Sequence, residues 1–189
     1  MIERILQDLS EKINANCTFL SKPCGVARLQ RERVEKKVKV YAVVPNLDPT
    51  TCNKQPYLAM LPCTQETAIC YFEVLDNIVT KQDKKIYEAT ATVRLVGWIN
   101  TKRFENYQQG SIEQAVIQQL NDKNIAGVNH IELTRLEPKT AQIFQKYTYD
   151  EAETQYLMHP FDFFSIVLKI TYFNAFGCAE MPILSQNQC

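Results

Sequence analysis

The chain has 189 residues, a length typical of one domain, and 46% of the residues are apolar while 22% are charged. This composition predicts a folded core and excludes an intrinsically disordered chain. The 21 basic residues balance the 21 acidic ones, so there is no overall positive field to concentrate nucleic acid or an anionic membrane, and dedicated binding to either is disfavoured.

The N-terminal segment predicts an amphipathic helix over residues 1–13. Its apolar residues recur on one stripe at helical spacing: Ile2, Ile5, Leu6, Leu9 and Ile13. Charged residues are threaded between them, so the segment lacks the continuous apolar region of a signal peptide. The longest apolar stretch, residues 163–172, is shorter than the roughly 20 residues of a membrane helix. We therefore expect neither export by a signal peptide nor a membrane partner.

Residues 33–44 alternate in polarity and predict one half-buried strand. Its apolar face carries Val34, Val38, Val40, Ala42 and Val44. Residues 45–62 follow with four prolines and no sustained periodicity. Loops longer than about 12–15 residues are usually functional or disordered. This arm-like loop is therefore either a contact element or a flexible surface insertion.

The clearest pattern predicts a long antiparallel hairpin over residues 68–104. Residues 86–104 alternate, with one face carrying Tyr87, Ala89, Ala91, Val93 and Leu95 and the other Glu88, Thr90, Thr92 and Arg94. A polar turn near residues 81–84 joins them to the apolar run 68–79. Arms of this length either project beyond the core or bend over their own domain.

The last elements are a helix, two strands and a short helix between them. Residues 111–122 predict a helix in which Ser111 and Gln114 form a capping box. Residues 128–136 predict a strand, Pro138 opens a short helix, and residues 161–174 predict a closing strand. The fold class is α+β with a mainly antiparallel sheet. We expect one domain over residues 1–178 and an extended tail over residues 179–189.

No catalytic, nucleotide-binding or metal-binding motif is present in the sequence. The seven cysteines are odd in number and form no CxxC pair, which predicts reduced thiols in a cytosolic protein. We expect no cofactor, no metal site and no enzymatic activity. The alternative is a small cytosolic enzyme or ligand-binding domain with a pocket built from Cys63, Cys70 and His130.

The order of elements resembles that of the head-to-tail connector and tail-terminator ring proteins of tailed bacteriophages. The resemblance rests on the first helix, the long hairpin, the helix after it and the closing segment HPFDFFSIVLKITYFN. It implies a structural virion protein, made in the cytoplasm of the bacterial host, that forms a ring in the neck or tail-completion region. Its partners are then copies of itself, other proteins of the portal–tail complex, and DNA that passes without sequence-specific binding.

Three segments are expected to make the contacts between subunits. The hairpin tip contributes Lys81, Gln82, Asp83, Lys84 and Lys85; the arm-like loop contributes Pro45, Asn46, Pro49 and Pro56; the tail contributes Met181, Pro182, Ile183 and Leu184. An exposed strand or arm of this kind can add to the sheet of a neighbouring subunit.

Overall fold

The computed structural model describes residues 1–34, 37–46, 56–83, 86–105, 108, 110–120, 125–139, 141–148 and 157–175. It confirms an α+β fold with a helix at the N-terminus and antiparallel sheets. The helices are α1 (Ile2–Asn16), α2 (Ser111–Leu120) and the 3-10 turns η1 (Thr101–Arg103) and η2 (Ala141–Phe144). The strands are β1 (Arg28–Val34), β2 (Lys37–Pro45), β3 (Tyr57–Ala59), β4 (Ala68–Asp83), β5 (Ile86–Asn100), β6 (Val128–Leu136) and β7 (Phe161–Ala175).

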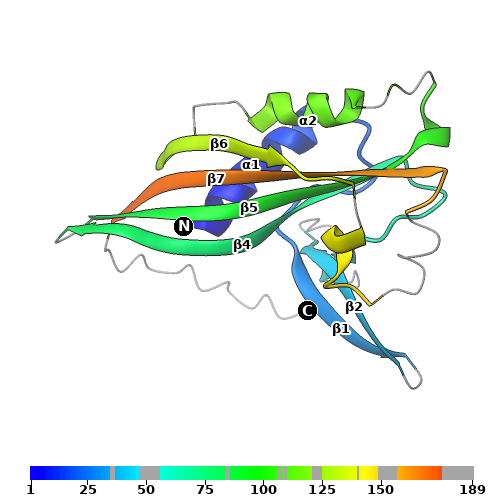
Figure 1. Ribbon diagram of the computed structural model, residues 1–189, viewed down its shortest axis with the longest axis horizontal. Coiled ribbons are helices and arrows are strands. Elements are labelled where there is room, and N and C mark those ends of the chain that lie inside the picture. The colour runs from blue at the N-terminus through cyan, green and yellow to red at the C-terminus, as the bar shows by residue number, and fades with distance from the viewer. Residues whose placement is uncertain are drawn as a thin grey trace, which may run out of the picture.

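The larger sheet has the strand order β4-β5-β7-β6, and every neighbouring pair is antiparallel. β4 and β5 form the predicted hairpin, with arms of 16 and 15 residues. The closing strand β7 pairs with β5 along its whole length and with β6 from Ile166 to Tyr172, so it lies between them (Figure 1). The two strands at the edges of this sheet are therefore β4 and β6.

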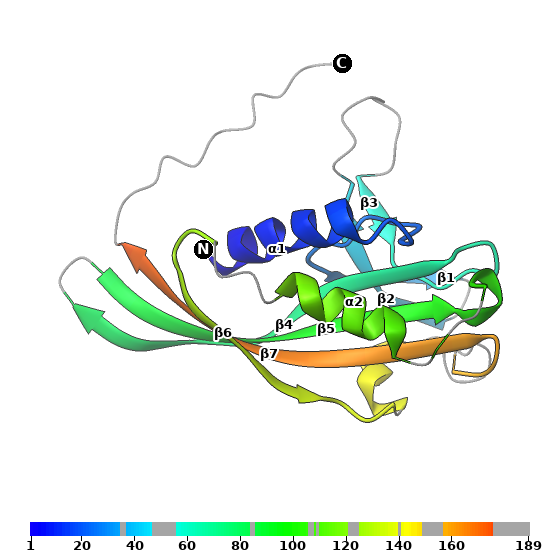
Figure 2. The same ribbon diagram turned by 90° about the horizontal axis from the view of Figure 1, so that it is seen from above.

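Both α-helices cover one face of this sheet (Figure 2). The predicted stripe on α1 is buried, with Leu6 and Leu9 wholly inaccessible to solvent. It packs against the inward face of β5 and β7, whose alternation puts Val93, Leu95 and Ile166 in the same core. The apolar stripe of the helix, which repeats every 3.6 residues, and the apolar faces of the strands, which repeat every 2 residues, therefore pack together in one layer.

A second core lies on the opposite face, near one end of the sheet. The smaller sheet, in the order β1-β2-β3, places Ala42 and Val44 against Tyr71 and Trp98 of the larger sheet. The segment around η2 adds Phe144, whose ring stacks on Trp98 with centroids 4.3 Å apart. The hairpin end of the larger sheet extends beyond the smaller sheet (Figure 1).

Two predictions about the first half of the chain are wrong. Residues 33–44 are not one strand, because Arg33 and Val34 belong to β1 and pair with Val38 and Lys37 of β2. The loop predicted over residues 45–62 is shorter, because Pro45 ends β2 and pairs with Tyr57 of β3. Alternation along one strand would put Arg33 and Val38 on opposite faces, whereas their pairing across the sheet puts them on the same face.

The predicted capping box of α2 is also wrong. The Ser111 hydroxyl donates a hydrogen bond to the Gln108 carbonyl, 2.7 Å away, and the Gln114 backbone N–H donates to the Gly110 carbonyl. Gly110, with φ of 83°, therefore takes the position that precedes the helix. Neither α-helix of the described residues is long and apolar enough to cross a membrane.

Candidate functional site

The predicted contact residues lie at the hairpin end of the larger sheet, beside the smaller sheet, or outside the described residues. Lys81, Gln82 and Asp83 form the last part of β4, next to the hairpin turn. Pro45, Asn46 and Pro56 lie at the base of the predicted arm, where the Asn46 N–H donates to the Pro56 carbonyl. The remaining predicted positions fall outside the described residues: Lys84, Lys85, Pro49, Met181, Pro182, Ile183 and Leu184.

The edge of β4 is divided into a covered half and an open half. Residues 20–27 run beside its first half, through bridges from Leu20 to Ala68 and from Val26 to Phe72. Beyond Phe72, no strand of the described residues pairs with the outer edge of β4. Four exposed apolar side chains lie on this open half: Val74, Leu75, Ile78 and Val79. Ile78 and Val79 are the most exposed, at 56% and 55%.

The opposite edge, β6, is open in the same way. It pairs with β7 on one side, and no described strand lies on the other. Leu133 and Leu136 are exposed on it, at 41% and 51%. Unpaired strand edges with exposed apolar residues are places where other chains add, and soluble proteins usually protect them.

The two open edges have irregularities at the same heights in the sheet. β4 shifts register after Val74 and again after Val79, and β6 shifts after Val128 and after Leu133. The cross-strand pairs place Val74 level with Leu133, through Val93 and Leu168. They place Val79 level with Val128 through Ala89 and Tyr172. Since a register shift increases local twist, both edges twist more strongly at matching heights.

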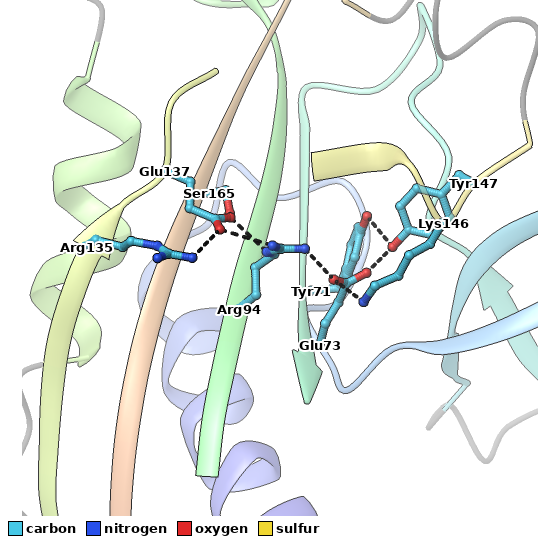
Figure 3. A network of polar contacts seen from close by, with 8 residues as sticks. All are labelled: Tyr71, Glu73, Arg94, Arg135, Glu137, Lys146, Tyr147 and Ser165. Atoms are coloured by element: carbon cyan, nitrogen blue, oxygen red, sulfur yellow. Dashed lines mark hydrogen bonds and ion pairs between the residues drawn. The ribbon is translucent and has the colours of Figure 1, made fainter. Parts of the chain in front are cut away.

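A network of charged and hydroxyl side chains, buried at its centre and exposed at both ends, crosses all four strands on the face away from the helices (Figure 3). At its centre is Arg94 of β5, which lies between Glu73 of β4 and Glu137 beyond the end of β6. The Arg94 NH1 atom is 3.5 Å from Glu73 Oε2, and Arg94 Nε is 2.8 Å from Glu137 Oε2. We call the eight residues of this cluster the ionic network: Tyr71, Glu73, Arg94, Arg135, Glu137, Lys146, Tyr147 and Ser165.

The two carboxylates are held by further donors on each side of Arg94. Lys146 Nζ donates to Glu73 Oε2 over 3.1 Å, and the Tyr147 hydroxyl donates to Glu73 Oε1. The Tyr71 hydroxyl in turn donates to the Tyr147 hydroxyl. Glu137 accepts from the Ser165 hydroxyl at 2.6 Å. These bonds fix the segment after η2 and the end of β6 to the sheet.

Burial and hydrogen bonding set the protonation of this network. Burial raises the pKa of Glu137, but hydrogen bonds from Ser165 and Arg94 outweigh it and the net pKa is lowered. Burial raises the pKa of Tyr71 and of Tyr147, and the negative charge of Glu73 raises both further. The carboxylate of Glu137 is thus charged and the phenols are neutral at neutral pH, which is the state that satisfies every bond described above.

Sequence reasoning missed the ionic network. Arg94 shares one face of β5 with Thr90 and Thr92, and this polar pattern gives no sign that the face is buried at Arg94. A signal was present in β7, where Phe163 and Val167 flank Ser165 on the polar side of the strand. Apolar residues on both faces of a strand indicate that both faces are covered.

The alternative pocket of Cys63, Cys70 and His130 does not form. Cys63 is exposed, Cys70 is buried beneath α1, and His130 is exposed on β6. Three strand spacings separate β4 from β6, and Cys70 is level with Phe164 while His130 is level with Thr171. At about 4.8 Å per strand and 3.4 Å per residue, Cys70 and His130 lie more than about 20 Å apart.

Neither of two hollows at the surface brings Cys63, Cys70 and His130 together. A hollow of about 350 Å³ lies on the smaller sheet, between Glu32, Tyr41 and Tyr57. Another, beside Cys63 and Trp98, has room for about 10 Å³. Within the described part of the chain, no group of three histidine, cysteine or acidic side chains is arranged to hold a metal ion.

Comparison with protein-family models, curated proteins and solved structures found no match to this chain. The function of the open edges of β4 and β6 and of the ionic network is therefore interpreted from the structure of this chain alone.

Proposed function

We propose that this chain is a structural subunit that assembles head to tail with copies of itself, the open edge of β4 in one copy pairing with β6 of the next. The observation that carries the proposal is the open half of β4, a long strand edge with four exposed apolar side chains. Burying these side chains and pairing the free backbone groups stabilises an assembled state over a single copy.

The direction of the strands favours this pairing. The sheet has four antiparallel strands, so its two edges run in opposite directions. A neighbour in the same orientation therefore presents β6 antiparallel to β4, and the antiparallel pattern continues across the join. Because β4 and β6 shift register at matching heights, the neighbour's edge follows the same twist.

The charges on the two edges are compatible with the same arrangement. Asp76 on β4 is level with Glu132 on β6, through Thr92 and Lys169. On β6, Glu132 is flanked by His130 and Arg135. Residues diagonal to one another across a strand pair are within reach of long side chains, so the charge of Arg135 offsets the repulsion between the two acids.

Contacts between different edges form a ring if the rotation closes and a filament if it does not. We place the subunit in a closed ring of a tailed-bacteriophage virion, in the head-to-tail connector or tail terminator. This placement rests on the resemblance in the order of α1, the β4–β5 hairpin, α2 and β7. The balanced charge is compatible with DNA that passes such a ring without being retained.

The test blocks each edge separately. Ile78→Lys introduces a charge on the open half of β4, and Leu133→Lys does the same on β6. In head-to-tail assembly each variant alone stays monomeric, whereas an equal mixture forms dimers, because one variant keeps a free β6 and the other a free β4. Sedimentation velocity measures both, and electron microscopy of the unmodified protein shows closed rings.

The matched control is Gln118→Lys, which adds the same charge on the exposed side of α2 and leaves the assembly intact. An unmodified protein that remains monomeric at every concentration tested contradicts the proposal. Dimers of the Leu133→Lys variant alone contradict the head-to-tail arrangement, because they show pairing of two β4 edges.

A further inference from the structure

We infer that Cys24 and Cys70 form a disulfide site, in which the two thiols join when the protein meets a disulfide-containing oxidant. The inference concerns the interior of one subunit and does not depend on the proposed assembly. Both residues lie in the core beneath α1, with exposed fractions of 4% and 1%.

The backbone places the two cysteines opposite each other. Val26 forms a parallel bridge with Phe72, confirmed by hydrogen bonds from the Phe72 N–H to the Gly25 carbonyl and from the Ala27 N–H to the Phe72 carbonyl. Two residues earlier on each strand are Cys24 and Cys70. They therefore share the face of the sheet that carries Phe72 and packs beneath α1.

The distance between neighbouring strands suits a disulfide. Adjacent strands lie about 4.8 Å apart. Disulfides join residues whose Cα atoms are roughly 4.4–6.8 Å apart. The two side chains already interact, because a hydrogen bond with Cys24 is the main cause that raises the pKa of the Cys70 thiol, ahead of burial.

The side chain of Asn14 holds Cys24 in this position. Its Oδ1 accepts from the Cys24 N–H over 2.6 Å, and its Nδ2 donates to the Cys24 carbonyl over 3.1 Å. The last turn of α1 thus fixes the backbone of Cys24 beside β4. This arrangement reduces the rearrangement needed to bring the two sulfur atoms into bonding contact.

The oxidation is an exchange with a small disulfide such as oxidised glutathione. One protein thiolate attacks a glutathione sulfur, so that a mixed disulfide forms, the glutathione S–S bond breaks and a first glutathione leaves. The second protein thiolate then attacks the protein sulfur of the mixed disulfide and releases the second glutathione. Two electrons pass from the cysteine pair to the oxidant, and the two protein thiol protons end on the two released glutathiones.

The closed disulfide joins the N-terminal segment to β4. It encloses residues 25–69, which include the whole of the smaller sheet. In the cytosol the pair stays reduced, and outside the cell it closes. A covalent link of this kind stabilises the fold once the protein has left the compartment in which it was made.

The test uses a variant in which Cys24 and Cys70 are the only cysteines: Cys17→Ala with Cys52→Ser, Cys63→Ser, Cys178→Ser and Cys189→Ser. It is incubated in a glutathione redox buffer with urea just below the unfolding midpoint, so that local opening exposes both thiols. We expect a monomer that has lost two hydrogen atoms, a tryptic pair linking residues 13–28 to residues 55–81, and a Tm raised by on the order of 10 °C.

The matched control carries the further change Cys24→Ser and gains only a glutathione adduct. If the two-cysteine variant also yields only adducts or free thiols, the inference is wrong. Should that variant fail to fold, the natural chain serves instead, with its accessible thiols first blocked by N-ethylmaleimide. Because residues 13–28 also contain Cys17, fragmentation of the linked peptides must place the bond on Cys24 and Cys70, and the absence of that bond overturns the site.

Discussion

Gly97 of β5 lies directly opposite Phe164 of β7, and the ring of Phe164 occupies the space that a side chain at position 97 would fill. A Cβ atom added to Gly97 would overlap three atoms of this ring. Phe164 is buried among the residues beneath the helices, so the ring has little room to move away. The glycine is therefore required by close packing rather than by an unusual backbone angle.

Gly97→Ala should destabilise the fold by about 1–3 kcal/mol, the usual cost of overpacking a filled core. Urea unfolding measures the change. Phe164→Leu removes the ring, so Gly97→Ala should cost less in that background, and the two changes together should cost less than the sum of each alone. Additive costs would show that the ring is not what excludes a side chain at position 97.

Two arginines contact the same carboxylate of Glu137 from different environments. The side chain of Arg94 is 15% exposed and that of Arg135 is 62% exposed. Removing Arg94 leaves Glu73 and Glu137 buried without their shared partner, whereas Arg135 is a surface ion pair. Arg94→Met should therefore cost about 3–5 kcal/mol of unfolding free energy, and Arg135→Met less than about 1 kcal/mol.

Urea unfolding of the two variants beside the parent protein tests this difference. Both substitutions replace an arginine by methionine and remove a contact to the Glu137 carboxylate, so each is the control for the other. Equal costs would mean that the position of Arg94 between the two acids contributes nothing beyond one ion pair.

The elements with strong periodicity were predictable from sequence. The stripe from Ile2 to Ile13 and the alternation from Tyr87 to Leu95 depend on neighbours along the chain, and both appear in the structure with nearly the predicted bounds. The turn between β1 and β2 was missed, because Glu35 and Lys36 include neither of the residues that usually mark turns, glycine and proline.

The candidate sites were harder to predict, because they depend on contacts between distant segments. Glu73 and Lys146 are 73 residues apart, and nothing local in either segment indicates that they pair. The predicted hairpin led to β4, but the open half of its edge depends on where residues 20–27 stop pairing with it. Such information is present only when the whole topology is known.

Because the pKa of Glu137 is lowered in the folded protein, part of the free energy of unfolding is lost when the pH becomes acid. Because the pKa is lower in the folded state than in the unfolded chain, the charged carboxylate stabilises the fold at neutral pH. This contribution is present above the unfolded pKa of about 4.3 and is lost as the pH falls through the folded value. Glu137→Gln should therefore be less stable than the parent at pH 7, and the gap should narrow on acidification.

Urea unfolding from neutral to acid pH measures this gap. Glu132→Gln on the exposed side of β6 is the control, because it makes the same chemical change outside the ionic network. A gap between parent and Glu137→Gln that stays constant down to the acid limit would show that the Ser165 and Arg94 contacts do not favour the charged carboxylate.

The two asparagines at the end of α1 allow the effect of the Asn14 hydrogen bonds on the position of Cys24 to be tested separately. Asn14 bonds to both backbone groups of Cys24, whereas Asn16 donates to the Lys12 carbonyl within the helix. Asn14→Ala should lower the free energy of unfolding by about 1–3 kcal/mol, because it removes the partners of two backbone groups, and Asn16→Ala should lower it by less.

Alkylation of Cys24 should also become faster in Asn14→Ala, since the segment that covers the thiol opens more often. Mass spectrometry after timed exposure to iodoacetamide measures that rate, and equal rates in the two variants would mean that Asn14 does not keep Cys24 against β4.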